Sequence, residues 1–483
     1  MADTPGSSAN RSLPWSFHQH VSGYASGRHD RTHLRHPPGR AIHRDTIYSD
    51  TLGPMSVEPR RVLHHSVMMR VRSYLVESSG IRLRVIAGIV LCGALGGAIG
   101  AAYLVVLDAV QQLIGPSRWA PSAHLAVLVV VGLTVAGLVR LLGKPADVEL
   151  LVDNIHVPDG SHGKEARLRS LVPISLLCIG AGGTLGPEAP LVTTTGAIAH
   201  RQAHRAGLSP NDVRILTITG MAAGFAVLFG APLGGAVFAL EIPHRRGIGY
   251  HEAAVPACIG AVAGLACSTA AGRAGLRPIW AVPRLGRLTW LDLPWSVVAG
   301  VVGAVVALLF TAVVRAASRG SALLPLAVRP AVGGLALGAL ALYSPYALTN
   351  GEFQIDHLLG ATAIATLLVA AAAKLVGAAV CVATGWRGGF IIPLFFVGFC
   401  VGGALAPHLP GATPWPFVLG VMIAANVGVT KTPLGSTLVV TEMAGAALLP
   451  SALIAAIVSL VLTSSLEVIE SQRDRVDAYG AAS

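Results

Sequence analysis

Long apolar runs fill most of the chain between about residues 83 and 468. Val85–Val106 and Ala123–Leu142 are examples, and each is long enough to cross a hydrocarbon layer of roughly 30 Å as a helix. The runs are continuously apolar and lack the alternation of polar and apolar residues that barrel strands show. Because backbone amides in lipid must be paired internally, the pattern predicts an all-α polytopic membrane protein.

Glycine and proline interrupt several of these runs. The chain contains 56 Gly and 30 Pro, and closely spaced Gly and Pro break a helix partway through a run. Irregular backbone at membrane depth is tolerated where it lines a cavity. The pattern therefore predicts broken and re-entrant helices beside those that span.

Composition supports a membrane protein and argues against an enzyme. Hydrophobic residues make up 53% of the chain and charged residues 12%, whereas a soluble domain is about a quarter charged. The six cysteines lie singly in apolar segments, and the spans contain no HExxH sequence or Cys/His spacing for a metal. We therefore expect no metal, no cofactor and no enzymatic activity.

The two ends of the chain are polar. Residues 1–82 contain 11 Arg and 6 acids, which predicts a disordered, basic, cytoplasmic N-terminal tail. A nucleic-acid arm is the alternative, but the segment lacks interleaved aromatic residues, so we expect no nucleic-acid partner. Residues 469–483 are predicted to be a short cytoplasmic tail. A membrane domain over residues 83–468 lies between them, with lipid around it.

An internal repeat relates the two halves of the membrane domain. Pro232 and Pro433 each begin an apolar helix of similar sequence, and Glu241 and Glu442 each follow nine residues later. A second pair of matching motifs ends 42 and 40 residues before these prolines. The repeats are predicted to cover about residues 83–270 and 290–468. Repeats of this kind place a binding site at their interface near the middle of the bilayer.

The first of the upstream motifs consists of Gly186, Pro187, Glu188, Ala189 and Pro190. The prolines and glycine end the preceding run, and a new helix should start near Pro190. Glu188 would then lie at a helix N-terminus, where free N–H groups favour an anion. The hypothesis is that Glu188 substitutes for a mobile anion and moves aside for it. The alternative is a simple N-terminal cap.

The matching motif in the second half consists of Gly389, Phe390, Ile391, Ile392 and Pro393. It has no acid, so its amides are available to a ligand, although a simple kink in a helix is an equal alternative.

Other charged residues in the spans have two interpretations each. Glu241 and Glu442 are interpreted either as proton-path carboxylates or, because their places in the repeat match, as structural groups. Lys431 either contributes positive potential to a permeation route or extends to the membrane interface.

These residues resemble the CLC family of chloride channels and proton/chloride antiporters over roughly residues 83–468. The two upstream motifs are similar to its Gly-Arg/Lys-Glu-Gly-Pro and Gly-x-Phe-x-Pro elements. The segments Gly230–Glu241 and Pro433–Ala444 are similar to its two Pro-Leu…Glu helices.

The resemblance implies a CLC-type inverted-repeat fold and a homodimer, in which each subunit has a pore gated by Glu188. It also implies that the anion is coordinated by the backbone amides of Phe390 and Ile391. A bacterial-type location in the cell inner membrane is expected, with both termini cytoplasmic.

The chain departs from the family pattern at four places. No serine is found near Gly143–Asp147, and no tyrosine is found near Leu466–Arg473, so two expected side-chain ligands are missing. Ile242 occupies the position of a second acid found in proton-coupled members. Pro187 and Ala189 replace an arginine or lysine and a glycine around the gating glutamate.

The predicted function is transport of small monovalent anions, with chloride expected, through a channel-like or weakly proton-coupled pore. A proton-coupled chloride or fluoride antiporter is the alternative. A non-conducting scaffold and an intramembrane enzyme are further alternatives.

Overall fold

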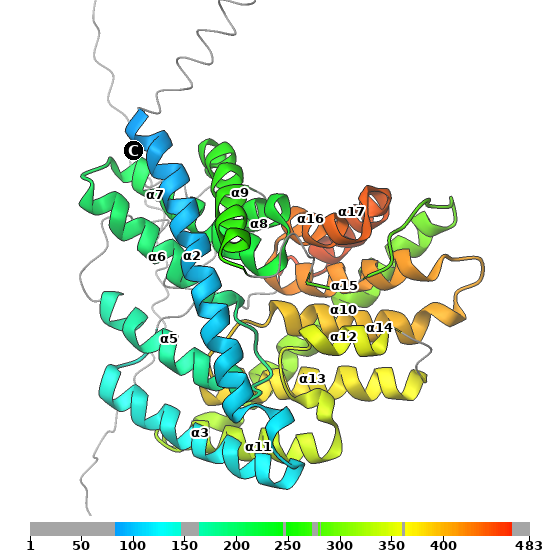
Figure 1. Cartoon of the computed structure of the whole chain (residues 1–483). Helices are drawn as coiled ribbons and strands as arrows, with labels where there is room; N and C mark the ends of the chain where they lie inside the picture. Colours follow the sequence, from blue (N-terminus) through cyan, green and yellow to red (C-terminus); the bar gives the residue numbers. More distant parts are fainter. Residues whose placement is uncertain are drawn as a thin grey trace, which may run out of the picture. The chain divides into compact units, whose positions relative to one another are not determined.

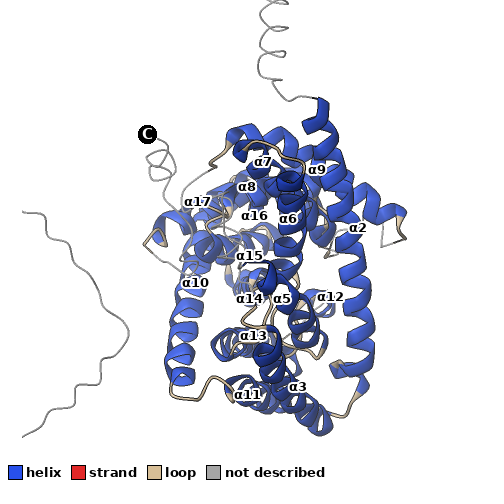
Figure 2. Cartoon of the chain, turned by 90° about the vertical axis from the view of Figure 1, so that its left-hand side faces the viewer, coloured by secondary structure: helices blue, strands red, loops and turns tan. Residues whose placement is uncertain are grey.

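The computed structural model describes residues 83–145, 164–244, 248–272, 279–280, 282–359 and 363–465. The predicted tails, residues 1–82 and 469–483, lie outside these ranges. Within them the regular elements are helices joined by loops (Figure 2). The all-α prediction is confirmed.

The helices fall into two successive groups. The first contains α2 (Leu83–Ile114), α3 (Pro121–Leu142), α5 (Lys164–Gly180), α6 (Glu188–Arg205), α7 (Pro210–Phe229), α8 (Pro232–Glu241) and α9 (Ala254–Ala270). The second contains α10 (Asp292–Ala322), α11 (Arg329–Tyr343), α12 (Glu352–Leu358), α13 (Ile364–Thr384), α14 (Ile391–Leu405), α15 (Pro414–Thr430), α16 (Pro433–Ala444) and α17 (Leu449–Leu462). Short 3-10 helices occupy Pro116–Arg118, His251–Ala253, Pro345–Ala347, Ala406–His408 and Ala446–Leu448.

Helix length separates full spans from shorter segments. Seven helices in the described part of the chain are long and apolar enough to cross a membrane. Others, such as α8, α11 and α15, are apolar but have only 10 to 17 residues. A helix of 10 residues is about 15 Å long, half the hydrocarbon thickness. The prediction of broken helices beside spanning ones is therefore confirmed.

Helices α8 and α16 show how the two repeats fit together, and they lie side by side in Figure 1. A Cβ atom on Gly234 would lie 2.6 Å from the backbone nitrogen of Val439, and one on Gly435 would lie 2.6 Å from Cα of Phe238. The start of each helix therefore contacts the later part of the other, so the pair is antiparallel. Glycine permits this close backbone approach.

Each of these helices is capped by a glutamate from the last turn of the other. Glu241 accepts hydrogen bonds from the backbone N–H groups of Leu434 at 3.1 Å and Gly435 at 2.7 Å. Glu442 accepts one from the N–H of Gly234. The carboxylates thus satisfy free N–H groups in the first turn of the opposite helix. This geometry corresponds to the structural interpretation of the two acids.

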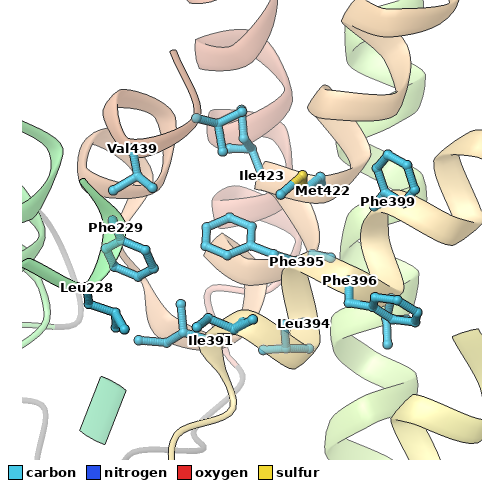
Figure 3. Close-up of a cluster of buried hydrophobic side chains, with 14 of the residues drawn as sticks. Leu228, Phe229, Ile391, Leu394, Phe395, Phe396, Phe399, Met422, Ile423 and Val439 are labelled. Atoms are coloured by element: carbon cyan, nitrogen blue, oxygen red, sulfur yellow. The ribbon is translucent and has the colours of Figure 1, made fainter. Parts of the chain in front are cut away.

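An apolar cluster fixes the start of α14. Phe395 contacts Phe229 of α7 in an edge-on arrangement with ring centroids 6.5 Å apart. Figure 3 shows Ile391, Phe395 and Val439 among the side chains of this cluster. Dense packing of this kind leaves little room for displacement. The N-terminus of α14 is consequently held by side chains from both halves of the chain.

Candidate functional site

The two motifs singled out in the sequence meet directly. The N–H of Gly186 donates to the carbonyl oxygen of Gly389 at 2.7 Å, and the N–H of Gly389 donates back at 2.6 Å. This isolated antiparallel bridge lies just before α6 in one half and just before α14 in the other. The N-termini of α6 and α14 are therefore brought together.

Glycine is required at the bridge. A Cβ atom on Gly389 would lie 2.8 Å from Oε2 of Glu188 and 3.0 Å from the nitrogen of Ala189. A Cβ on Gly186 would overlap the Glu188 carboxylate. Glycine in each motif thus has a steric reason, because a larger residue at either position would separate the two helix ends or displace the Glu188 carboxylate.

The two helix starts also share the position of proline. Helix α6 begins at Glu188 and has Pro190 as its third residue, and α14 begins at Ile391 and has Pro393 as its third residue. The first turn of a helix tolerates proline because its N–H groups have no intrahelical partner. The start expected near Pro190 lies two residues earlier.

The Glu188 side chain occupies the junction of the two helices. It is fully buried, and its Oε1 accepts a hydrogen bond from the backbone N–H of Ile392 at 2.5 Å. Among the described residues, its Oε2 has no hydrogen-bond partner. The carboxylate therefore reaches from the N-terminus of α6 to that of α14 and places its charge where both helix ends favour an anion.

An inner cavity of about 50 Å³ adjoins this carboxylate. Its lining combines both helix starts with apolar side chains and two threonines. It consists of Glu188, Ala189, Val192, Thr193, Met221, Phe225, Ile242, Gly388, Gly389, Phe390, Ile391 and Thr430. A dry site with few polar groups strengthens electrostatic interactions with an ion inside it. The space is suited to one small anion.

Sequence reasoning missed part of this lining. It identified the residues of the two motifs, and it noted Ile242 only as a departure. It did not single out Thr430, Met221 or Phe225. Met221 and Phe225 lie within α7, and Thr430 is the last residue of α15. The polar Thr430 immediately before the Lys431–Pro433 break was the one available signal.

A larger outer cavity of about 720 Å³ lies against Pro187. Three carboxylates are in its lining, contributed by Asp108 of α2 and by Glu352 and Asp356 of α12. The sequence analysis did not predict these acids as part of the site. Pro187 lines the outer cavity, whereas Glu188 and Ala189 line the inner one, so consecutive residues of the Gly186–Pro190 motif contact the two cavities.

The two intramembrane lysines lie outside the lining of the inner cavity. Lys374 is fully buried and donates to the carbonyl oxygens of Leu348 at 2.7 Å and Thr349 at 2.8 Å and to Oε1 of Gln354 at 2.7 Å. Lys431 is buried and donates to the carbonyl oxygen of Gly428 at 2.7 Å. Both ammonium groups bind neutral oxygens inside the protein.

Two of the departures fall partly or wholly outside the described residues. Gly143 ends α3 and the description stops at residue 145, so Ala146 and Asp147 lie beyond it. The segment Leu466–Arg473 also lies outside. Gly143, Lys144 and Pro145 are described, and none of the three lines the inner cavity.

Comparison with known proteins assigns the family. The model of the voltage gated chloride channel family matches residues 162–464, which is more than half of the chain. The chain belongs to the CLC family. It is 30% identical to a chloride/fluoride channel protein of Pseudomonas syringae pv. tomato over 404 residues, which are 79% of this chain and 85% of that protein. It is 28% identical to the voltage-gated ClC-type chloride channel ClcB of Escherichia coli O81, covering 60% and 71% of the two chains.

Solved CLC structures have the same fold. A CLC-type fluoride/proton antiporter matches with a TM-score of 0.71 and 23% identity, covering 81% of this chain and 98% of that one. A slow cyanobacterial Cl⁻/H⁺ antiporter matches with a TM-score of 0.69 and 18% identity, covering 80% and 95%. The predicted CLC-type inverted-repeat architecture is confirmed.

Family membership sets the general function. The protein is a multi-pass integral membrane protein of a family that transports anions, and this family is not enzymatic. The two motifs that carried the resemblance lie at the junction of α6 and α14.

Proposed function

We propose that the protein moves small monovalent anions, with chloride as the expected substrate and fluoride as a second candidate. The route passes the junction of α6 and α14, and Glu188 gates it. When ionised, the Glu188 carboxylate occupies the anion site. When it is protonated or displaced, a mobile anion takes its place and receives the same backbone donors.

The single observation that carries this proposal is the bond from the Ile392 N–H to Glu188. A carboxylate held by the N-terminus of a second helix is bound as a free anion would be. The family resemblance implied amides of Phe390 and Ile391 as ligands. The geometry adds the amide of Ile392, which lies one residue further along the same helix start.

Loose or absent proton coupling is the favoured mode of transport. Ile242, at the position of a second acid in proton-coupled relatives, lies in the wall of the inner cavity and cannot carry a proton. Glu241 precedes it, but its carboxylate is engaged by Leu434 and Gly435. The alternative is a proton-coupled antiporter, which is supported by the similarity to a fluoride/proton antiporter and a Cl⁻/H⁺ antiporter.

The orientation in the membrane follows from charge. Arg201 and Arg205 lie near the end of α6, and Arg214 lies near the start of α7. Basic segments of this kind between two spans remain on the cytoplasmic side. The outer cavity contacts the opposite end of α7 at Val227 and Leu228, so it opens outward. We further propose a homodimer in the cell inner membrane, with both termini cytoplasmic.

Anion efflux from proteoliposomes tests the proposal. Vesicles loaded with chloride, nitrate or fluoride are clamped with potassium and valinomycin, and efflux is followed with and without a protonophore. Efflux above that of empty vesicles is expected, and it should persist without a proton pathway if coupling is weak. Absence of efflux for all three anions would refute anion transport, and efflux that requires coupled proton movement would establish the antiporter alternative.

A further inference from the structure

Thr430 is one of the few polar residues in the wall of the inner cavity. It is the last residue of α15, it is fully buried, and it lines the same cavity as Glu188 and the start of α14. The cavity wall has few other polar side chains. A hydroxyl at this place would matter for an anion, because the backbone amides that face the cavity are otherwise its main donors.

A chain of buried polar groups ends at Thr430. Its Oγ1 lies 2.7 Å from Oγ1 of Thr432, which lies 2.9 Å from Oγ of Ser436. The Ser436 Oγ in turn accepts a hydrogen bond from Nδ2 of Asn426 at 2.8 Å. The left-handed backbone of Lys431, with φ of 61°, turns the chain so that the two threonine hydroxyls meet. All four polar side chains are fully buried.

The amide of Asn426 sets the direction of this chain. An amide NH₂ group only donates, so Ser436 must accept from it and pass its own proton to Thr432. Thr432 then donates to Thr430. In the reverse direction the Ser436 hydroxyl would point its proton at the NH₂ group of Asn426, which cannot accept a hydrogen bond. Among the hydrogen bonds between these four side chains and their described neighbours, the first direction gives every hydroxyl proton an acceptor.

Thr430 is therefore left with one proton to donate. In the structure its Oγ1 lies 2.9 Å from the carbonyl oxygen of Asn426, which is the usual bond of a threonine within a helix. Rotation about the Cβ–Oγ1 bond would redirect the proton to the cavity and keep the contact with Thr432. The donors behind it polarise the hydroxyl and strengthen the bond that it makes.

We propose that Thr430 is an anion-binding residue whose hydroxyl is oriented toward the inner cavity by the Asn426–Ser436–Thr432 chain. The proposal rests on the anion transport proposed above and deepens it. The ligand class is a small anion that accepts strong hydrogen bonds, such as fluoride or chloride. A large, weakly accepting anion such as thiocyanate gains less from the hydroxyl. Thr430 thus supplies side-chain selectivity that backbone amides alone lack.

Anion binding to the purified full-length protein tests this assignment. Affinities for chloride, fluoride and thiocyanate are measured by isothermal titration calorimetry, and the KM for chloride is measured by efflux. Thr430→Val removes the hydroxyl and keeps the shape, and Thr430→Ser keeps the hydroxyl. Thr437→Val is the matched control, since Thr437 is buried on α16 and lies outside the lining of the cavity.

Thr430→Val should weaken chloride and fluoride binding by about tenfold or more, and thiocyanate binding by less than about threefold. Thr430→Ser should restore the wild-type ratio, and Thr437→Val should leave it unchanged. Equal losses for all anions, no loss, or the same change in Thr437→Val would overturn the assignment.

A second variant keeps the test decisive if Thr430→Val does not fold. Ser436→Ala interrupts the chain and leaves Thr430 in place, so it should lower the chloride-to-thiocyanate ratio severalfold. An unchanged ratio would refute the oriented chain. If the wild-type protein binds and transports none of the anions, the proposed function itself fails, which is a different outcome from normal transport with unaltered selectivity in the variants.

Discussion

Replacement of Glu188 by alanine should increase anion affinity. In the wild-type protein an entering anion competes with a carboxylate that is already held by the N–H of Ile392. Alanine vacates this place and leaves the donors at the starts of α6 and α14 unoccupied. A mobile anion in the variant then receives these donors without having to displace another charge.

The size of the effect follows from the interactions that the carboxylate loses when it moves. A hydrogen bond to a charged group contributes roughly 1.5–3 kcal/mol. Each helix N-terminus adds about 0.3–1 kcal/mol, but a carboxylate that moves aside and stays near both helix starts keeps most of this term, so the hydrogen bond sets the difference. The net competition of about 1.5–3 kcal/mol corresponds to roughly a ten- to hundredfold gain in affinity for chloride.

Calorimetric titration with chloride and efflux between pH 4 and 8 measure the effect. The wild-type flux should rise as the pH falls, because protonation removes the charge that holds the carboxylate in the site. Glu188→Gln keeps the shape without the charge, so its flux should persist and lose most of this pH dependence. Glu188→Ala should show the tighter binding at neutral pH.

A simple cap predicts different results. If Glu188 only stabilises the start of α6, both variants should unfold more easily by about 0.5–2 kcal/mol and keep the wild-type pH profile. An unchanged pH profile together with unchanged chloride affinity would refute the gating role, even in a protein that transports anions.

Four further variants and one control variant probe the surroundings of the site. Gly389→Ala should lower chloride efflux at least about tenfold, because its Cβ would lie 2.8 Å from the gating carboxylate; Gly137→Ala, with open space around it, should retain wild-type efflux. Glu442→Ala should lower the free energy of unfolding by about 1–3 kcal/mol, since it leaves an N–H at the start of α8 unpaired; unaltered stability in denaturant titration would contradict the cap. Lys374→Met should cost at least about 2 kcal/mol by the same assay, because three buried oxygens lose their donor. Ile242→Glu places an acid in the inner cavity, and chloride-driven proton movement should then become measurable in vesicles; no proton movement would show that the position lies off a proton path.

The architecture was largely predictable because it depends on local patterns. Continuous apolar runs indicated spans, and the Gly-Pro breaks indicated helices that end within the membrane. The two similar motifs also predicted a shared interface, and the bond pair between Gly186 and Gly389 provides it. Each of these signals is contained in a short stretch of sequence with a direct physical reason.

The contacts within the site were less predictable because they join distant segments. No local pattern indicates that the Glu188 carboxylate selects the amide of Ile392, 204 residues away. Thr430 looked like the end of an apolar helix, and its exposure to the cavity depends on the angle between α15 and α16. Lys374 is buried against two carbonyl oxygens of the segment between α11 and α12 and one side-chain oxygen of α12, an arrangement that only tertiary packing defines.

The reciprocal capping of α8 and α16 has a consequence for biosynthesis. The N–H of Gly234 receives its acceptor from Glu442, which is 208 residues later in the chain. At about 5–20 residues per second, a ribosome takes roughly 10–40 s to make that interval. During this time the first repeat is already in the membrane with the start of α8 incomplete. It cannot finish folding alone and must wait, or be shielded by the insertion machinery, until nearly the whole second repeat has been translated.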